Sequence, residues 1–291
     1  MRTLFLLVFC LAQWLVGGSM AAWAGPTGSE VAAQLNTRFN TIVDDCTDSD
    51  GVRVPAHYCS GIIMRTTEHG NYHAWDPPPS NNAVSFSYWR ADMHPERWQG
   101  SNTLYHANGF IFKPTSFVVD NFYDIRYNCI YPRDAGTSGS TANYRCGGSS
   151  GVPGPDYASC PNAGISTSAQ WVAAYQSSTS RNCTFSVINP NLFLQSLKAT
   201  VDSGSIGHWS KWDELIAASW PQGQPSRLPL EAFFYDSERT NPGLANAKYD
   251  QMDLCQVAGI FLPVIRLDVR SSFTFSYNPS DQQYPSGQCP G

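Results

Sequence analysis

The chain has 291 residues, of which 14% are charged and 13% are aromatic. A charged fraction well below the usual value of about 25% excludes a disordered, charged tail protein and indicates a globular chain with a hydrophobic core. The net charge of −5 also excludes a general nucleic-acid binder, which needs a basic surface.

The chain begins with a segment typical of a secretory signal peptide. Arg2 precedes an apolar run from Leu4 to Val16, and the small-residue pattern Ala22-Trp23-Ala24 follows. The run is shorter than the roughly 20 residues that span a bilayer. We therefore expect cleavage after Ala24 and a single secreted catalytic domain over residues 25–291, extracellular or periplasmic, without a membrane span.

Hydrophobic periodicity predicts a mixture of helices and strands. In chain order, we expect a helix at 29–45, strands at 61–65, 84–88, 110–112 and 125–131, helices at 168–176, 191–201 and 210–220, a strand at 230–235, a helix at 245–257 and a strand at 260–269. Segment 134–161 is rich in Gly, Ser and Pro and predicts a cross-linked surface loop. Because no internal repeat is present, this order predicts one α+β domain.

The cysteines predict disulfide bonds. Removal of the signal segment with Cys10 leaves eight of the nine cysteines, and none of these forms a Cys-x-x-Cys pair. An even count in an exported chain is typical of a disulfide framework rather than a metal site, so we expect no bound metal. Eight cysteines allow 105 pairings, and the sequence does not select among them.

Three short motifs have stronger structural than chemical explanations. Ser149 fits the G-x-S-x-G pattern of hydrolases but lacks the strand before it and the helix after it. His69 and His73 are four residues apart, yet Gly and Pro residues around them argue against a helix that would pair them as metal ligands. The segment Ser166-Thr167-Ser168 precedes a helical pattern, where capping explains it.

A more informative set of residues combines an arginine, a serine pair and a late glutamate. Arg65 ends an apolar strand, and its planar fork of donors suits a phosphate. Ser85 and Ser87 share one face of the next strand. Glu231 lies in an otherwise apolar strand, where a carboxylate needs a partner or a function.

An aromatic segment between the arginine and the serines completes this set. His73 and Trp75 stand beside Asp76 and precede three prolines, so they offer either a platform for a flat ligand or an anchor for a turn. Each member of the set also has a structural explanation, such as a surface ion pair for Arg65 or a solvent-facing strand edge for the serines.

At these residues the chain resembles the secreted halovibrin-type proteins. The resemblance rests on Cys59-Ser60-Gly61-Ile62-Ile63-Met64-Arg65, Tyr72-His73-x-Trp75-x-Pro77, Val84-Ser85-Phe86-Ser87-Tyr88, Asn108-Gly109-Phe110-Ile111-Phe112, Leu228-Pro229-Leu230-Glu231-Ala232-Phe233-Phe234-Tyr235, Tyr249-Asp250-Gln251 and Pro263-Val264-Ile265-Arg266-Leu267. It implies an enzyme that acts on NAD as an ADP-ribosyltransferase or an NAD glycohydrolase. NAD is then a cosubstrate, and a protein acceptor of ADP-ribose is the second expected partner of a monomeric enzyme.

The same residues follow the order found in cholera-toxin-like ADP-ribosyltransferases, which implies mixed sheets with flanking helices. By this resemblance Arg65 holds an NAD phosphate, Ser85 and Ser87 order the site, and Phe86 or Trp75 stacks on the nicotinamide. Glu231 would stabilise the oxocarbenium-like state as the glycosidic bond breaks.

A second alignment with these toxins stays open. In it Arg90, within Tyr88-Trp89-Arg90-Ala91-Asp92, replaces Arg65, and Ser166-Thr167-Ser168 supplies the serine motif. Pro229 stands where arginine-modifying transferases carry a second carboxylate, which favours NAD hydrolysis over protein modification. The alternative class of function is a secreted, aromatic-rich module that binds glycans or a surface without catalysis.

Overall fold

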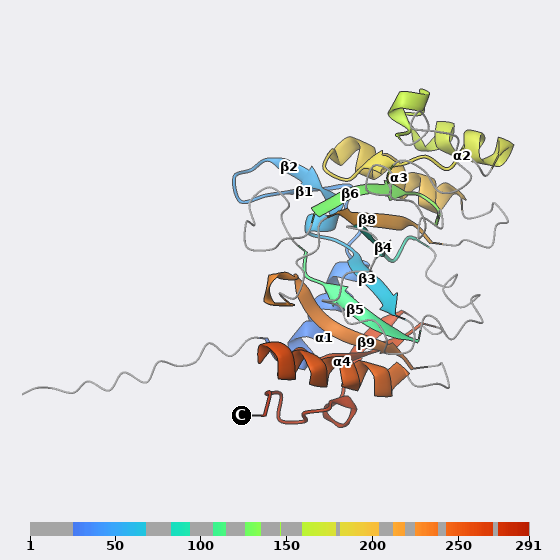
Figure 1. The fold of residues 1–291 in the computed structure, drawn as a ribbon. Helices are drawn as coiled ribbons and strands as arrows, with labels where there is room; N and C mark the ends of the chain where they lie inside the picture. Colours follow the sequence, from blue (N-terminus) through green and yellow to red (C-terminus); the bar gives the residue numbers. More distant parts are fainter. Residues whose placement is uncertain are drawn as a thin grey trace, which may run out of the picture.

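The computed structural model describes residues 26–67, 83–93, 107–114, 126–134, 146, 159–178, 181–203, 212–218, 225–237, 243–269 and 273–290. Over these ranges the chain is an α+β protein, built on a nine-stranded sheet with helices on both faces (Figure 1). This confirms the predicted α+β class.

The four described α-helices match predicted helices. They are α1 (Gly28–Asn40), α2 (Ser168–Ser177), α3 (Pro190–Asp202) and α4 (Gly243–Ala258). Thr27 caps α1, since its side chain accepts a hydrogen bond from the Glu30 N–H, while the Glu30 carboxylate accepts one from the Thr27 backbone N–H. Thr167 caps α2 in the same way with Gln170, which confirms the capping interpretation of the 166–168 segment.

Six strands of the large sheet were predicted from the sequence. They are β3 (Ile62–Thr67), β4 (Ala83–Trp89), β5 (Asn108–Phe112), β6 (Arg126–Tyr131), β9 (Leu230–Asp236) and β10 (Val264–Asp268). The sheet also contains β7 (Phe185–Ser186), β8 (Glu214–Ala218) and β11 (Thr274–Tyr277), and β1 (Asp45–Thr47) pairs separately with β2 (Arg53–Pro55). The order of the large sheet is β11-β10-β9-β5-β3-β4-β8-β6-β7.

The helix predicted at 210–220 is wrong, because strand β8 occupies its centre. β8 pairs with β4 on one side and with β6 on the other, and Leu215, Ile216 and Ala217 are all buried. A short apolar run buried on both faces of a central strand has no alternation, so its pattern does not distinguish it from a buried helix.

The sheet divides between β3 and β4. These strands pair only where Ile62–Met64 lies opposite Ser87–Trp89. Beyond Met64, β3 continues against β5 alone, while the first half of β4 continues against β8 alone. The division therefore places the end of β3 and the start of β4 beside each other without a backbone ladder between them.

Each face of the sheet has its own hydrophobic core. On one face, Val31, Leu35 and Phe39 of α1 pack against strand residues such as Ile62 and Phe234. On the other face, residues of α2, α3 and α4 pack in one larger cluster with the alternate strand positions. Successive side chains of β3, β4, β5 and β9 thus enter different cores, as the two-residue period of a strand requires.

Four disulfides confirm the cysteine prediction. The pairs are Cys46–Cys59, Cys129–Cys146, Cys160–Cys183 and Cys255–Cys289. Cys146 and Cys160 come from the predicted loop at 134–161, most of which lies outside the described residues. No helix within the described part of the chain is long and apolar enough to cross a bilayer.

Candidate functional site

Glu231 lies in a bulge of strand β9. Its neighbours Leu230 and Ala232 face Phe112 and Ile111, two consecutive residues of β5, so Glu231 is the extra residue of β9. A bulge of this kind turns a side chain away from the regular alternation. The Glu231 carboxylate consequently reaches the face that α1 covers.

The partner of Glu231 is Arg38 in the last turn of α1. The two guanidinium nitrogens donate to the two carboxylate oxygens at 3.2 and 2.5 Å, and the side chains are 14% and 6% exposed. Such a two-point pairing offsets the charges of both groups where they are shielded from water. The sequence indicates that this carboxylate needs a partner or a function, and the structure provides a partner.

Arg65 lies where the sheet divides. It follows Met64, the last residue of β3 that pairs with β4, and its guanidinium donates a hydrogen bond to the backbone carbonyl of Ser85. The side chain thereby bridges β3 and β4 just beyond their shared ladder. Arg65 is half-buried, so part of the side chain remains open to solvent.

Ser85 and Ser87 point to the same sheet face, as predicted, and both contact the start of β8. Ser85 Oγ donates a 2.6 Å hydrogen bond to Glu214 Oε1, while Ser87 Oγ lies 3.4 Å from the Asp213 carbonyl. Phe86 between them points to the other face, where its ring packs against Phe110 and Phe112. Because Phe86 is 2% exposed, it is a core residue and not an open surface for a nicotinamide ring.

Two adjacent carboxyl groups, Asp213 and Glu214, were missed by the sequence analysis. Both are buried, and Asp213 Oδ1 accepts a 2.8 Å hydrogen bond from the Tyr88 backbone N–H. The signal that drew attention to Glu231, a carboxylate in an apolar strand, is also present in Glu214-Leu215-Ile216-Ala217. Because a helix was predicted at 210–220, Glu214 was not identified as a carboxylate in an apolar strand.

Burial raises the pKa of the Asp213 carboxyl well above its ordinary value of 3.8, and the nearby Glu214 raises it further. The Tyr88 N–H opposes this rise by stabilising the charged form. The environment thus favours a protonated Asp213, which limits the negative charge beside Glu214.

The described contacts form a chain from Arg65 through Ser85 to Glu214, which we call the Arg65–Ser85–Glu214 chain. The serine accepts from the arginine with its backbone carbonyl and donates to the glutamate with its hydroxyl. The Arg65–Ser85–Glu214 chain thus combines a cation suited to phosphate, an ordered hydroxyl and a buried carboxylate at the division of the sheet.

Glu231 is not part of this group. Two strands, β5 and β3, separate β9 from β4, which corresponds to about 14 Å at the usual strand spacing. The structure therefore brings Arg65 and Ser85 together with Glu214 and not with Glu231.

Arg90, the alternative arginine, is buried directly after β4. Its guanidinium makes a two-point ion pair with Asp92 at 2.7 and 2.8 Å and donates to the Val43 carbonyl. Within the described parts of the chain, no hydrogen bond joins it to the 166–168 segment, whose Thr167 caps α2.

Several predicted residues lie outside the described residues. These are His73 and Trp75 of the expected aromatic platform, together with His69 and Ser149. Within the described ranges, no group of three or more His, Cys, Asp and Glu side chains is arranged to hold a metal ion.

In comparisons with known proteins, no family model matches this chain and no curated protein is significantly similar to it.

Proposed function

We propose that this chain is a secreted enzyme that cleaves the bond between nicotinamide and ribose in NAD. The observation that carries the proposal is the 2.6 Å hydrogen bond between Ser85 and Glu214, beside the bridging guanidinium of Arg65. It groups the arginine and the serine that the resemblance to halovibrin-type proteins and cholera-toxin-like transferases implies, with Glu214 in the place of the implied Glu231. The signal-like segment and the four disulfides support an exported protein.

In this proposal Glu214 takes the role first assigned to Glu231. Glu231 is neutralised by a two-point ion pair beneath α1, so using it would require breaking that pair. Glu214 accepts a hydrogen bond from the Ser85 hydroxyl on the strand that Arg65 bridges, and the neighbouring Asp213 has a raised pKa. Glu214 is thus the carboxylate better suited to stabilise a developing positive charge.

The proposed reaction requires little proton transfer at the leaving group. The pyridinium nitrogen of NAD takes the electron pair of the breaking bond and leaves as neutral nicotinamide, while positive charge develops on the ribose. Glu214 would stabilise that charge and accept a hydrogen bond from a ribose hydroxyl. Arg65 would bind a phosphate of the same molecule, and water would then add to the ribose carbon and release one proton to solvent, which gives ADP-ribose.

Hydrolysis is favoured over transfer to a protein. Arginine-modifying transferases carry a second carboxylate two residues before the catalytic glutamate, and that position holds Trp212 before Glu214 and Pro229 before Glu231. ADP-ribosyl transfer to a protein acceptor stays the second outcome of the same bond cleavage.

The non-catalytic alternative, a glycan-binding module, relies on exposed aromatic rings that stack on sugars. Among the aromatic residues that the structure describes, only Tyr249 is exposed.

The test is incubation of the oxidised, purified protein with NAD, with nicotinamide release followed by chromatography. Arg65→Lys keeps the charge but loses the planar fork, so it should raise KM for NAD more than it lowers kcat. Arg90→Lys serves as the comparison, since the second alignment predicts that this variant carries the KM effect. No release by wild-type protein, with or without cell extract as a source of acceptor, would contradict the proposal.

A further inference from the structure

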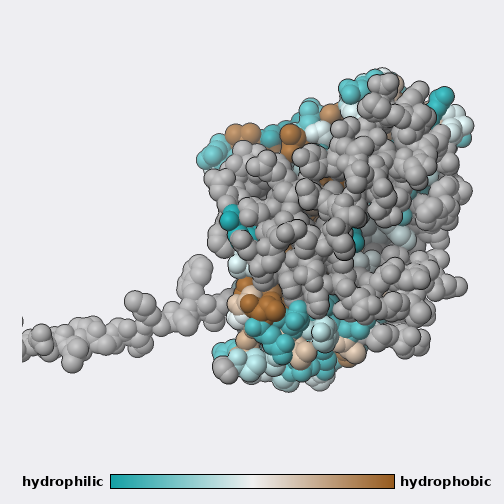
Figure 2. All heavy atoms as spheres, viewed as in Figure 1, coloured by the Kyte–Doolittle hydropathy of each residue, from teal (hydrophilic) through white to brown (hydrophobic). Residues whose placement is uncertain are grey.

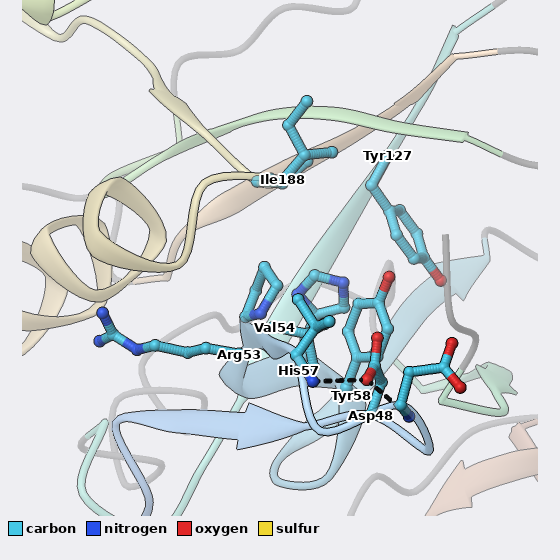
Figure 3. Close-up of a pocket in the computed structure, with 11 residues that line it drawn as sticks. Asp48, Arg53, Val54, His57, Tyr58, Tyr127 and Ile188 are labelled. Atoms are coloured by element: carbon cyan, nitrogen blue, oxygen red, sulfur yellow. Dashed lines mark hydrogen bonds between the residues drawn. The ribbon is translucent and has the colours of Figure 1, made fainter. Parts of the chain in front are cut away.

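A pocket of about 360 Å³ lies beside the small β1–β2 sheet, apart from the Arg65–Ser85–Glu214 chain (Figure 3). Its lining includes Asp48, Arg53, His57, Tyr58, Tyr127 and Ile188. Tyr127 lies opposite Ala217 of β8 and shares its core, whereas Glu214 projects to the other side of the sheet with Ser85. The pocket and the proposed NAD site are therefore on different faces.

A disulfide bond braces one wall of the pocket. Disulfide Cys46–Cys59 ties β1 to the residue that follows the short helix Ala56–Tyr58, and this helix carries His57 and Tyr58. Figure 3 shows the side chains of Tyr58 and Tyr127 close together, with Ile188 extending from a different segment above the β1–β2 end. A volume of this size is typical of sites for small molecules.

His57 is the most informative residue of the pocket. The residue is 4% exposed, and neither ring nitrogen has a hydrogen-bond partner among the described residues. Its ring contacts those of Tyr58, Tyr127 and Phe193, with centroids 5.0, 5.7 and 4.9 Å away. Buried polar groups normally have partners, so a lining histidine without one indicates a missing donor or acceptor.

Burial lowers the pKa of His57 to about 3, so the imidazole is neutral at physiological pH. A neutral imidazole presents one donor and one acceptor rather than a positive charge. His57 therefore suits a ligand with its own hydrogen-bonding group and does not repel a cation.

The charge at the rim of the pocket is negative. Asp48 and Asp50 line it, and Asp48 Oδ1 accepts hydrogen bonds from the N–H groups of Asp50 and Val52. Among the described residues of the lining, the one cation is Arg53, which is already paired with Asp45 and donates to Asn191. The rim therefore favours a positively charged ligand over an anion.

The rim is also partly hydrophobic. Val52 is 57% exposed and Ile188 is 60% exposed, although both are large apolar side chains. Hydrophobic residues, drawn in brown, are visible at the surface above the β1–β2 end of the molecule in Figure 2. Exposed apolar side chains around a concave site are typical of ligand-binding surfaces.

From this geometry we infer that the pocket binds a small aromatic amine. The aromatic ring lies against Tyr58 and Tyr127, a ring N–H or acceptor satisfies His57, and the ammonium group lies near Asp48 and Asp50. NAD, with two negatively charged phosphates, does not fit such a rim. The inference is therefore independent of the proposed NAD-cleaving activity.

The experiment compares two probes of similar shape and opposite charge, tryptamine and indole-3-acetate, by calorimetry on the oxidised full-length protein. Tryptamine should bind at least about tenfold more tightly than indole-3-acetate. The rim carboxylates attract the ammonium group of tryptamine and repel the carboxylate of indole-3-acetate, and a single such charge interaction is enough for a tenfold ratio. Asp50→Asn should reduce the tryptamine advantage, while Asp202→Asn, an exposed acid outside the pocket, should leave it unchanged.

A second readout reports on His57 itself. The ¹⁵N chemical shifts of its ring should change when tryptamine saturates the protein, and His57→Phe should weaken binding of both probes while circular dichroism stays native. Absence of binding by both probes, equal binding of both probes, or unchanged His57 shifts at saturation would each overturn the inference.

Discussion

The hydroxyl of Ser85 donates to the carboxylate of Glu214 across a 2.6 Å hydrogen bond that joins β4 to β8. This contact ties the serine pair to a carboxylate 129 residues along the chain, while the more conspicuous Glu231 is bound to Arg38. The two glutamates thus have different roles: Glu231 stabilises the contact of α1 with the sheet, and Glu214 belongs to the candidate site.

Glu231→Gln should lower the free energy of unfolding by about 3 kcal/mol, because it leaves the buried Arg38 charge without its counter-ion. Urea unfolding followed by circular dichroism measures this loss. The matched control is the double variant Arg38→Met with Glu231→Leu, which removes both ions and should recover most of the stability. A fully stable Glu231→Gln protein would contradict the structural role.

Gly109→Ala should distort the sheet at Arg65. Gly109 lies opposite Thr66, and a Cβ at this position would overlap the Arg65 carbonyl oxygen, which is backbone and not able to rotate away. We expect a loss of about 3 kcal/mol in unfolding free energy, at the upper end of the range for overpacked sites, because the overlapping atom belongs to the backbone. The comparison is Gly259→Ala, where φ is +65° but no atom lies within 4 Å, so only the backbone cost of about 1 kcal/mol applies. An equal loss in both variants would argue against the close contact at Arg65.

Asp250 should make the protein less stable as pH rises from about 4 to about 8. Burial in α4 raises the pKa of its carboxyl from 3.8 to about 8, with a smaller contribution from Asp253. The native state holds this proton more tightly than the unfolded chain, so its stabilising effect is complete below pH 3.8 and is lost as pH rises to about 8.

Asp250→Asn tests this dependence. The variant should flatten the decline and raise the unfolding free energy near neutral pH by at most about 4 kcal/mol. Urea titrations at several pH values measure the difference, with Asp253→Asn as the neighbouring control. If the unfolding free energy declines with pH equally in wild type and in Asp250→Asn, Asp250 is not the cause of the decline.

Removal of the Cys46–Cys59 disulfide should destabilise the end of the molecule that carries β1, β2 and the His57 pocket. The bond closes a loop between residues 13 positions apart, for which the chain-entropy estimate is about 3 kcal/mol. The double variant Cys46→Ser with Cys59→Ser should unfold at lower temperature by calorimetry. An unchanged melting temperature would mean that the loop is held by its other contacts.

The sequence predicted most elements with clear hydrophobic periodicity or a strong cap. Helix α3 has apolar residues on one face, and β4 alternates Phe86 and Tyr88 with serines, so both patterns match their environment. β8 was not predicted because it is buried on both faces and lacks alternation. The pairing of the cysteines was also not predicted, since their spacing in the sequence does not determine which of them form disulfide bonds.

The candidate site was predicted only in part, for a related reason. Arg65 and Ser85 are on neighbouring strands, so order along the chain is a fair guide to their proximity. The glutamate depends on long-range topology: β8 pairs with β4, whereas β9 is three strands away. The partner of Glu231, Arg38, is 193 residues away and belongs to the other end of the chain.

The most direct test of the account compares Glu214→Gln with Glu231→Gln in the release of nicotinamide from NAD. Each variant keeps the size of the side chain and removes its charge, and activity is measured at a temperature where both are folded by circular dichroism. With Glu214 as the catalytic carboxylate, Glu214→Gln should lower kcat by at least about a hundredfold, while Glu231→Gln should keep kcat and lose only stability. Full activity in Glu214→Gln together with an inactive, folded Glu231→Gln would contradict this assignment.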